Sequence, residues 1–152
     1  MNGTGRATVA MPTLLKGLSW AGPLLLVFCV VPLVDEWMLV FGRPMPPGWW
    51  WRSGAVALAF VPGVVLCAAA MLVIRRSWFA RMVYVLGWLL LTSSIPLIGH
   101  FAGFDPADAN PALVVNGACT VLIAAYLYAS PDVRRYFDAV SPRVSSSPGG
   151  NE

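Results

Sequence analysis

The chain has 152 residues, of which 58% are hydrophobic and 11% are charged, and its net charge is +3. A soluble domain carries about 25% charged residues, so this chain has too few polar residues to cover its apolar ones in water. The composition excludes an ordinary soluble domain and predicts a membrane protein. Nucleic-acid binding is also excluded, because the basic residues form no cluster with aromatic residues arranged for stacking.

Four segments without a charged residue are long enough to cross a bilayer, namely 17–34, 53–74, 82–104 and 109–131. A helix rises about 1.5 Å per residue, so about 20 apolar residues cross a hydrocarbon core roughly 30 Å thick. We therefore predict an all-α membrane protein, a four-transmembrane-helix bundle within residues 14–140. The small and polar residues of 1–13 and 141–152 predict disordered ends.

Basic residues are divided unevenly between the two sides of these segments. Two of them, Arg43 and Arg52, lie on one side. The other side holds both termini and Arg6, Lys16, Arg75, Arg76, Arg81, Arg134, Arg135 and Arg143. The positive-inside rule places this second side in the cytoplasm, which gives an N-in/C-in topology. Because Arg, Ala, Gly, Pro and Val are abundant, as in a GC-rich bacterium, we expect a multi-pass protein of the bacterial cytoplasmic (inner) membrane.

The first span, 17–34, contains Pro23, which should kink or start the helix. A signal peptide is the alternative interpretation of this segment. However, no small-residue cleavage motif follows it, and it is longer than the usual apolar core of about 7–15 residues. We expect an uncleaved helix.

The segment 35–52 between the first two spans is rich in proline and glycine, which predicts irregular structure. It ends with Trp49, Trp50 and Trp51, and tryptophan is favoured at the level of the lipid headgroups. We predict that the three form an interfacial anchor. A stacking platform for a lipid headgroup or a partner is the alternative.

The second span carries small residues at a spacing of four, which places them on one helix face: Ala55, Ala59, Gly63 and Cys67. In lipid such a ridge allows two helices to approach closely. We expect it to pack against another helix of the same chain, with a second protomer as the alternative.

The loop after this span is short, so the second and third spans should form an antiparallel hairpin. Its Arg75, Arg76 and Arg81, with Arg134 and Arg135, should fix the topology and contact anionic headgroups.

The third and fourth spans carry polar residues that could share a seam. These are Thr92, Ser93, Ser94 and His100 on one span and Asn116 and Thr120 on the other. In an antiparallel pair, Thr92 lies at the depth of Thr120. Whether this strip faces a seam or lipid is open. The hydroxyls have no base at their depth to activate them, so we expect no catalytic residue, no metal and no cofactor.

A short helix should follow the fourth span, beginning at Ser130 and Pro131. Val133, Tyr136, Phe137 and Val140 fall at i, i+3, i+4 and i+7. This spacing predicts a short amphipathic helix that lies on the cytoplasmic surface of the membrane.

Two segments resemble known families. The segment 126–137 (YLYASPDVRRYF) resembles the end of many small four-helix bacterial membrane proteins to which no activity is assigned. The segment 46–49 (PPGW) resembles the tryptophan-rich sensory (translocator) family. That family has five helices and further Trp and Asn motifs that this sequence lacks, so we reject it.

The sequence favours a non-enzymatic membrane protein that binds lipids or another membrane protein, self-association included. The small-residue ridge, the tryptophans and the basic side would carry this function. The alternative is a small oligomeric transporter or channel that uses the polar strip as its path.

Overall fold

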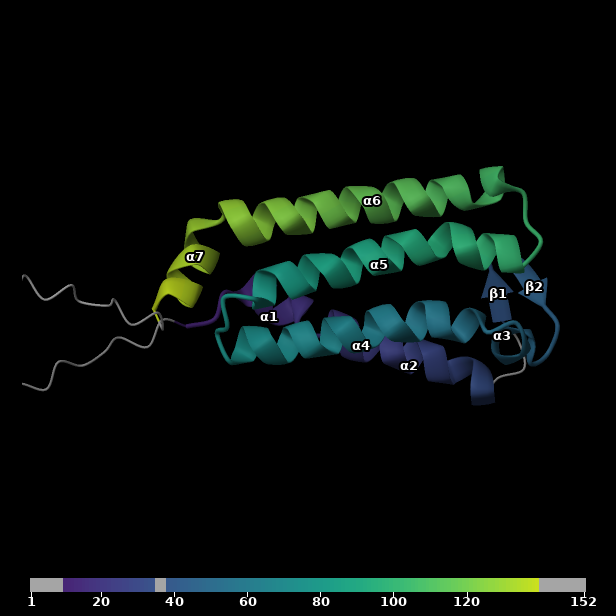
Figure 1. The fold of residues 1–152 in the computed structure, drawn as a ribbon, viewed down its shortest axis with the longest axis horizontal. Helices are drawn as coiled ribbons and strands as arrows, with labels where there is room; N and C mark the ends of the chain where they lie inside the picture. Colours follow the sequence, from purple (N-terminus) through teal and green to yellow (C-terminus); the bar gives the residue numbers. More distant parts are fainter. Residues whose placement is uncertain (1–9, 35–37, 140–152) are drawn as a thin grey trace, which may run out of the picture.

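The computed structural model describes residues 10–34 and 38–139, and this part of the chain is mostly helical (Figure 1). Its elements are α1 (Thr13–Leu18), α2 (Ala21–Val34), β1 (Met38–Val40), β2 (Arg43–Met45), α3 (Trp49–Arg52), α4 (Ala55–Ile74), α5 (Ala80–Phe101), α6 (Pro106–Ala129) and α7 (Pro131–Asp138). Three of them, α4, α5 and α6, are long and apolar enough to cross a membrane, by length and composition. The predicted disorder of 1–9 and 141–152 lies outside the described residues.

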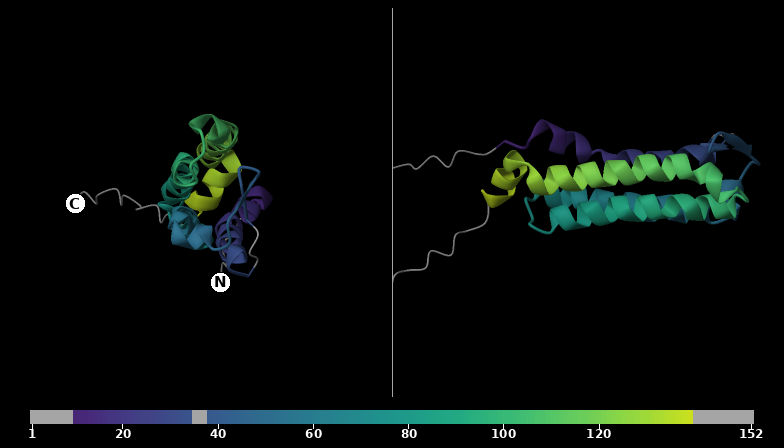
Figure 2. Two further views of the ribbon diagram at one scale, coloured as in Figure 1. Left: turned by 90° about the vertical axis from the view of Figure 1, so that its right-hand side faces the viewer. Right: turned by 90° about the horizontal axis from the view of Figure 1, so that it is seen from above.

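The helices form an open row in the order α2, α4, α5, α6. In this row α4 packs against both α2 and α5, and α5 packs against α6. Figure 2 shows the row end-on, with α2 and α6 at its two ends. The arrangement therefore differs from a closed bundle in which each helix has two helical neighbours.

The molecule's two ends along the helix axes differ in charge. The basic end holds the start of α1, the loop between α4 and α5, and α7 (Figure 1). Its basic residues are Lys16, Arg75, Arg76, Arg81, Arg134 and Arg135. The hairpin end holds β1, β2, α3 and the turn between α5 and α6, where Arg43 and Arg52 accompany Asp105 and Asp108.

The predicted helix over 17–34 is interrupted at Ser19 and Trp20, which separate α1 from α2. In a continuous helix the Ser19 carbonyl would accept a hydrogen bond from residue 23, but Pro23 has no N–H and its ring crowds that carbonyl. The Ser19 hydroxyl and the Ser19 N–H both donate to Leu15 O, at 3.0 and 3.1 Å, which closes α1. The Leu18 carbonyl accepts a hydrogen bond of 2.6 Å from the hydroxyl of Tyr84 in α5. The break thus lies where Pro23 offers no donor to the Ser19 carbonyl and where Tyr84 of α5 donates to the adjacent Leu18 carbonyl.

The prediction of irregular structure is wrong for the segment 38–45, which forms an antiparallel hairpin in the otherwise helical chain. Phe41 and Gly42 form its two-residue turn with φ of 49° and 80°, as a type I′ turn requires. Pro44 pairs with Leu39, next to the closing pair Val40 and Arg43. In such a hairpin that next pair exchanges no ladder hydrogen bonds, so proline loses none there.

Helix α6 begins at Pro106, ahead of the predicted start of its span at 109. The Asp105 carboxylate accepts a hydrogen bond of 2.9 Å from Ala107 N, which caps the helix. Pro106 occupies the first helical position, where its missing N–H costs no hydrogen bond.

Candidate functional site

The small-residue ridge of α4 faces α2 of the same chain. Ala55, Ala59 and Gly63 are buried and Cys67 is half-buried. A Cβ atom on Gly63 would lie 2.8 Å from Leu26 Cδ2, so α2 occupies the space that this glycine leaves. The ridge therefore serves the packing of the chain itself and is not free to receive a partner.

The glycines of the long helices differ in what surrounds them. A Cβ atom on Gly22 would overlap the backbone of Cys67, and one on Gly87 would lie 2.7 Å from Leu66 Cδ2. Gly63 is closed in the same way, by Leu26. In contrast, a Cβ atom on Gly117 in α6 would have no neighbour within 4 Å. Gly117 thus has no packing requirement within the described part of the chain.

The three consecutive tryptophans do not act as a uniform anchor. Trp50 is 6% exposed and packs with Cys29, Ala55 and Ala59, whereas Trp51 is 40% exposed. The one-turn helix α3 turns successive side chains by about 100°, which separates them. Trp50 is therefore a packing residue of the chain, whereas Trp49 is half-buried and Trp51 is exposed.

An exposed aromatic pair at the basic end was missed by the sequence interpretation. Trp78 is 70% exposed and Phe79 45% exposed, and their ring centroids are 4.0 Å apart. They lie in the loop between α4 and α5, between Arg76 and Arg81. An aromatic pair flanked by arginines at the end of an apolar span is the signal that could have identified it.

The predicted polar strip is divided between two faces of α5. Thr92 and Thr120 meet across the seam between α5 and α6 with 3.0 Å between their hydroxyl oxygens. The Thr120 hydroxyl donates to Asn116 O at 2.8 Å, so the proton between the two threonines comes from Thr92. The Asn116 amide donates to Ala112 O at 3.0 Å. Both threonine hydroxyls and one N–H of the Asn116 amide are thus used in hydrogen bonds within α6 or across the seam.

The two serines lie on the other side of α5, beside a groove between α4 and α5. The exposed Ser93 hydroxyl donates to Leu89 O and the buried Ser94 hydroxyl to Leu91 O. His100 is exposed and lies at the hairpin end beside a cavity of about 170 Å³ between α5 and α6. The structure therefore brings Thr92, Asn116 and Thr120 together and places the serines and His100 elsewhere.

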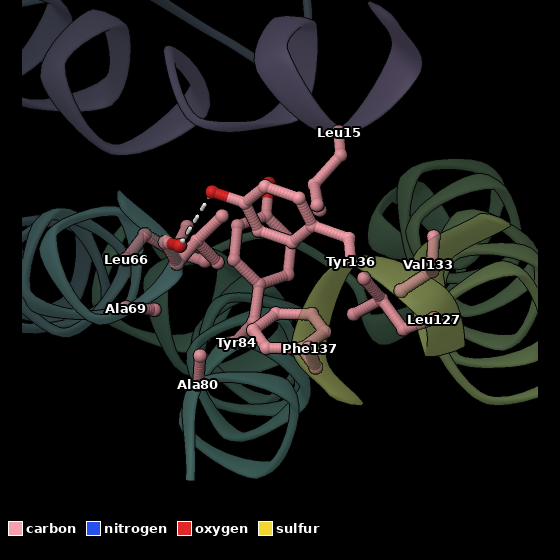
Figure 3. Packing of buried hydrophobic residues seen from close by; sticks show 10 residues of the cluster. Leu15, Leu66, Ala69, Ala80, Tyr84, Leu127, Val133, Tyr136 and Phe137 are labelled. Atoms are coloured by element: carbon pink, nitrogen blue, oxygen red, sulfur yellow. Dashed lines mark hydrogen bonds between the residues drawn. The ribbon is translucent and has the colours of Figure 1, made fainter. Parts of the chain in front are cut away.

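The apolar face of α7 is covered by protein rather than by a membrane surface, which corrects our prediction. Val133, Tyr136 and Phe137 are at most 3% exposed. Figure 3 shows Tyr136 and Phe137 pointing from α7 toward Tyr84, with Leu15 on the opposite side. The residue spacing predicts this face, but a local pattern does not reveal that α1, α4, α5 and α6 cover it.

Two of the predicted topogenic arginines lie over the aromatic rings of α7. The Cζ atom of Arg76 is 4.6 Å from the ring centroid of Tyr136, and that of Arg81 is 4.8 Å from the ring of Phe137. The Tyr136 hydroxyl donates to Val73 O at 3.2 Å (Figure 3). Arg75 and Arg135 are exposed, and Arg134 donates to Tyr128 O at 2.8 Å.

Known proteins add no assignment to this geometry. No family model, no curated protein and no solved structure matches the chain. Within residues 10–34 and 38–139, no group of three His, Cys, Asp or Glu side chains lies close enough together to hold a metal ion. A functional argument therefore starts from the surfaces that the fold leaves uncovered.

Proposed function

We propose that this is a non-enzymatic protein of a bacterial inner membrane that binds a transmembrane helix of a second protein chain through α6. The chain would cross the bilayer four times, with the basic end in the cytoplasm. The first crossing would be α1 and α2 together. The two helices run from the basic end to the hairpin end beside α4 (Figures 1 and 2). Neither alone is long enough to cross a bilayer, because α1 has 6 residues and α2 has 14.

The observation that carries the proposal is the exposure of α6. Of the most apolar 18-residue stretch of α6, 11% is buried inside the protein, whereas the corresponding share for α4 is 39%. Val114 and Val121 are 68% and 67% exposed, and Gly117 lies between them at the i, i+3 and i, i+4 spacing of one helix face. A helix-interior glycine costs about 1 kcal/mol relative to alanine, and no contact among the described residues explains this one. Small residues on an open face permit close approach of another helix in lipid.

Transport has less support from the same geometry. A polar path needs donors and acceptors that face a passage, but Thr92, Thr120 and Asn116 bond to each other or to their own helix. Lipids alone would satisfy an apolar face without requiring a glycine. We therefore favour a protein helix as the occupant, a second copy of this chain included.

Site-specific photocrosslinking tests the proposal in native membranes. A photoreactive residue at Val121 should give a discrete protein adduct, whereas one at Met71, exposed on α4, should give none. Gly117→Leu should lower the yield of the adduct more than about tenfold, because the leucine side chain would fill the surface that the partner helix approaches. Ala68→Leu, on the exposed face of α4, is the matched control and should leave the adduct intact. Adducts with lipid alone would contradict the proposal.

A further inference from the structure

A small cavity of about 170 Å³ lies at the hairpin end, between the end of α5 and the start of α6. Its apolar wall is formed by Pro96 and Gly99 of α5 and by Ala109 and Leu113 of α6. For comparison, an engineered apolar cavity of about 150 Å³ holds one molecule of benzene, whereas pockets for drug-sized ligands have about 300–1,000 Å³. The cavity therefore has room for one small chemical group and not for a drug-sized molecule.

Three polar side chains line the same cavity, namely those of His100, Asp105 and Asn110. One carboxylate oxygen of Asp105 accepts the hydrogen bond from Ala107 N that caps α6. The other oxygen of Asp105, the imidazole and the Asn110 amide form no hydrogen bond with the described part of the chain. The cavity thus offers a carboxylate oxygen and an amide oxygen as acceptors that these residues leave unused, and a neutral imidazole adds another.

The charges around the cavity favour a cationic ligand. Arg43 lies over the ring of Phe104, which is part of the cavity wall. However, Arg43 pairs with Asp108 at 2.8 Å, and among the described residues Asp105 forms no ion pair. A ligand with an ammonium group would bring both a positive charge and N–H donors to this carboxylate, and such charge-assisted hydrogen bonds are the stronger ones.

The position of the cavity indicates where such an ammonium group comes from. In the proposed crossing of the membrane, the hairpin end lies at the headgroups of the leaflet away from the cytoplasm, where the exposed Trp51 is also favoured. A primary ammonium donates three hydrogen bonds, and an aminoethyl group is smaller than benzene. A choline group carries methyl groups in place of these donors and is larger, and a glycerol headgroup carries no positive charge.

We propose that this cavity binds the ethanolamine headgroup of a phospholipid, with its ammonium group at Asp105 and Asn110. The lipid would hold the end of α5 and the start of α6 together at the membrane surface. This site rests on the proposed crossing of the membrane, but it does not depend on the binding of a partner helix by α6.

Native mass spectrometry of the chain in detergent measures the lipid preference directly. The chain would be incubated with equal amounts of phosphatidylethanolamine, phosphatidylcholine and phosphatidylglycerol that have the same acyl chains. The ethanolamine lipid should be retained at least about fivefold more than either of the others, because it alone brings an ammonium group with N–H donors. Equal retention of the three lipids would overturn the proposal.

Two variants locate the preference at the cavity. Asp105→Asn keeps the helix cap, because asparagine caps a helix about as well as aspartate, but it should lower retention of the ethanolamine lipid to that of the choline lipid. Asn110→Ala leaves the cap untouched and should lower the preference at least about threefold. Asp138→Asn removes the same charge at an exposed position of the basic end and should keep the preference. An unchanged preference in Asp105→Asn or in Asn110→Ala would contradict the proposal.

The soluble compound O-phosphoethanolamine distinguishes a lipid headgroup from a free amine. At the concentration of the lipid it should leave the lipid bound, because the acyl chains add apolar contact area. Displacement at that concentration would assign the cavity to a soluble amine and would contradict lipid binding. The photocrosslink from Val121 is a separate measurement, so the two proposals can fail independently.

Discussion

Glycine residues on the apolar helices have two different uses. At Gly22 an added Cβ atom would overlap the backbone of Cys67, which cannot move without separating α2 from α4. At Gly117 the same atom would meet nothing within 4 Å. The first glycine is a packing requirement of the chain, and the second is the basis of the proposed contact with a partner.

We expect Gly22→Ala and Gly117→Ala to have opposite effects on stability. Gly22→Ala should lower the free energy of unfolding by about 1–3 kcal/mol through overpacking. Gly117→Ala should be neutral or raise it by up to about 1 kcal/mol, because alanine favours the helix. Thermal unfolding of both variants in detergent measures the difference. Equal melting temperatures would show that α2 does not pack on α4 as described.

The hydroxyl group of Tyr84 should make a measurable contribution to the free energy of unfolding. It donates to the Leu18 carbonyl at the break between α1 and α2, and Tyr84 is 1% exposed. Tyr84→Phe leaves that carbonyl without this donor and should cost about 1–3 kcal/mol. Tyr128→Phe is a suitable control, because Tyr128 is 47% exposed. Denaturant unfolding in detergent compares the two, and an equal loss in both would contradict the role of the Leu18 hydrogen bond.

At the scale of elements, the β-hairpin depends on one ring more than on its ion pair. Phe41 packs edge-on against Phe104 with the centroids 5.8 Å apart and reaches Gly99. Arg43 and Asp108 form an ion pair of 2.8 Å, but their side chains are 60% and 34% exposed. Exposed pairs contribute at most about 1 kcal/mol, whereas an aromatic pair adds about 0.5–1.5 kcal/mol beyond the area that it buries.

Phe41→Ala should therefore loosen the hairpin more than Arg43→Ala. We expect hydrogen exchange at the amides of β1 and β2 to accelerate about tenfold in Phe41→Ala, which corresponds to about 1.4 kcal/mol. Arg43→Ala should change the exchange by less than about fivefold. The reverse order would mean that the ion pair holds the hairpin.

The sequence predicts the elements that depend on local composition and misses those that depend on tertiary contacts. The positions of α4, α5 and α6 follow from the charge-free segments at their centres, and the meeting of Thr92 with Thr120 follows from depth matching. The hairpin was missed because prolines suggest irregular structure, although Pro44 lies where the ladder needs no donor. The burial of Trp50 and the contact of Arg76 with Tyr136 join segments far apart in the chain, which no local pattern reveals.

At the scale of the whole molecule, the open row leaves the helices at its two ends, α2 and α6, each with one long helical neighbour. Helix α4 lies between two helical neighbours, whereas α6 has a long helical neighbour on one side, which is α5. In water such an apolar face would drive aggregation, but a lipid bilayer solvates it. The account therefore predicts that the row is stable in a membrane, where the positive-inside rule would place the basic end in the cytoplasm.

The most direct test of this account is the sidedness of single cysteines in a cysteine-free background, at Lys16, Gly42 and Ser77. A membrane-impermeant thiol reagent added to intact cells should label Gly42→Cys. Lys16→Cys and Ser77→Cys should react with the reagent after the membrane is opened and not before, because four crossings place the basic end inside. Labelling of Lys16→Cys and Gly42→Cys from the same side would show that α1 and α2 do not cross, and would contradict the account.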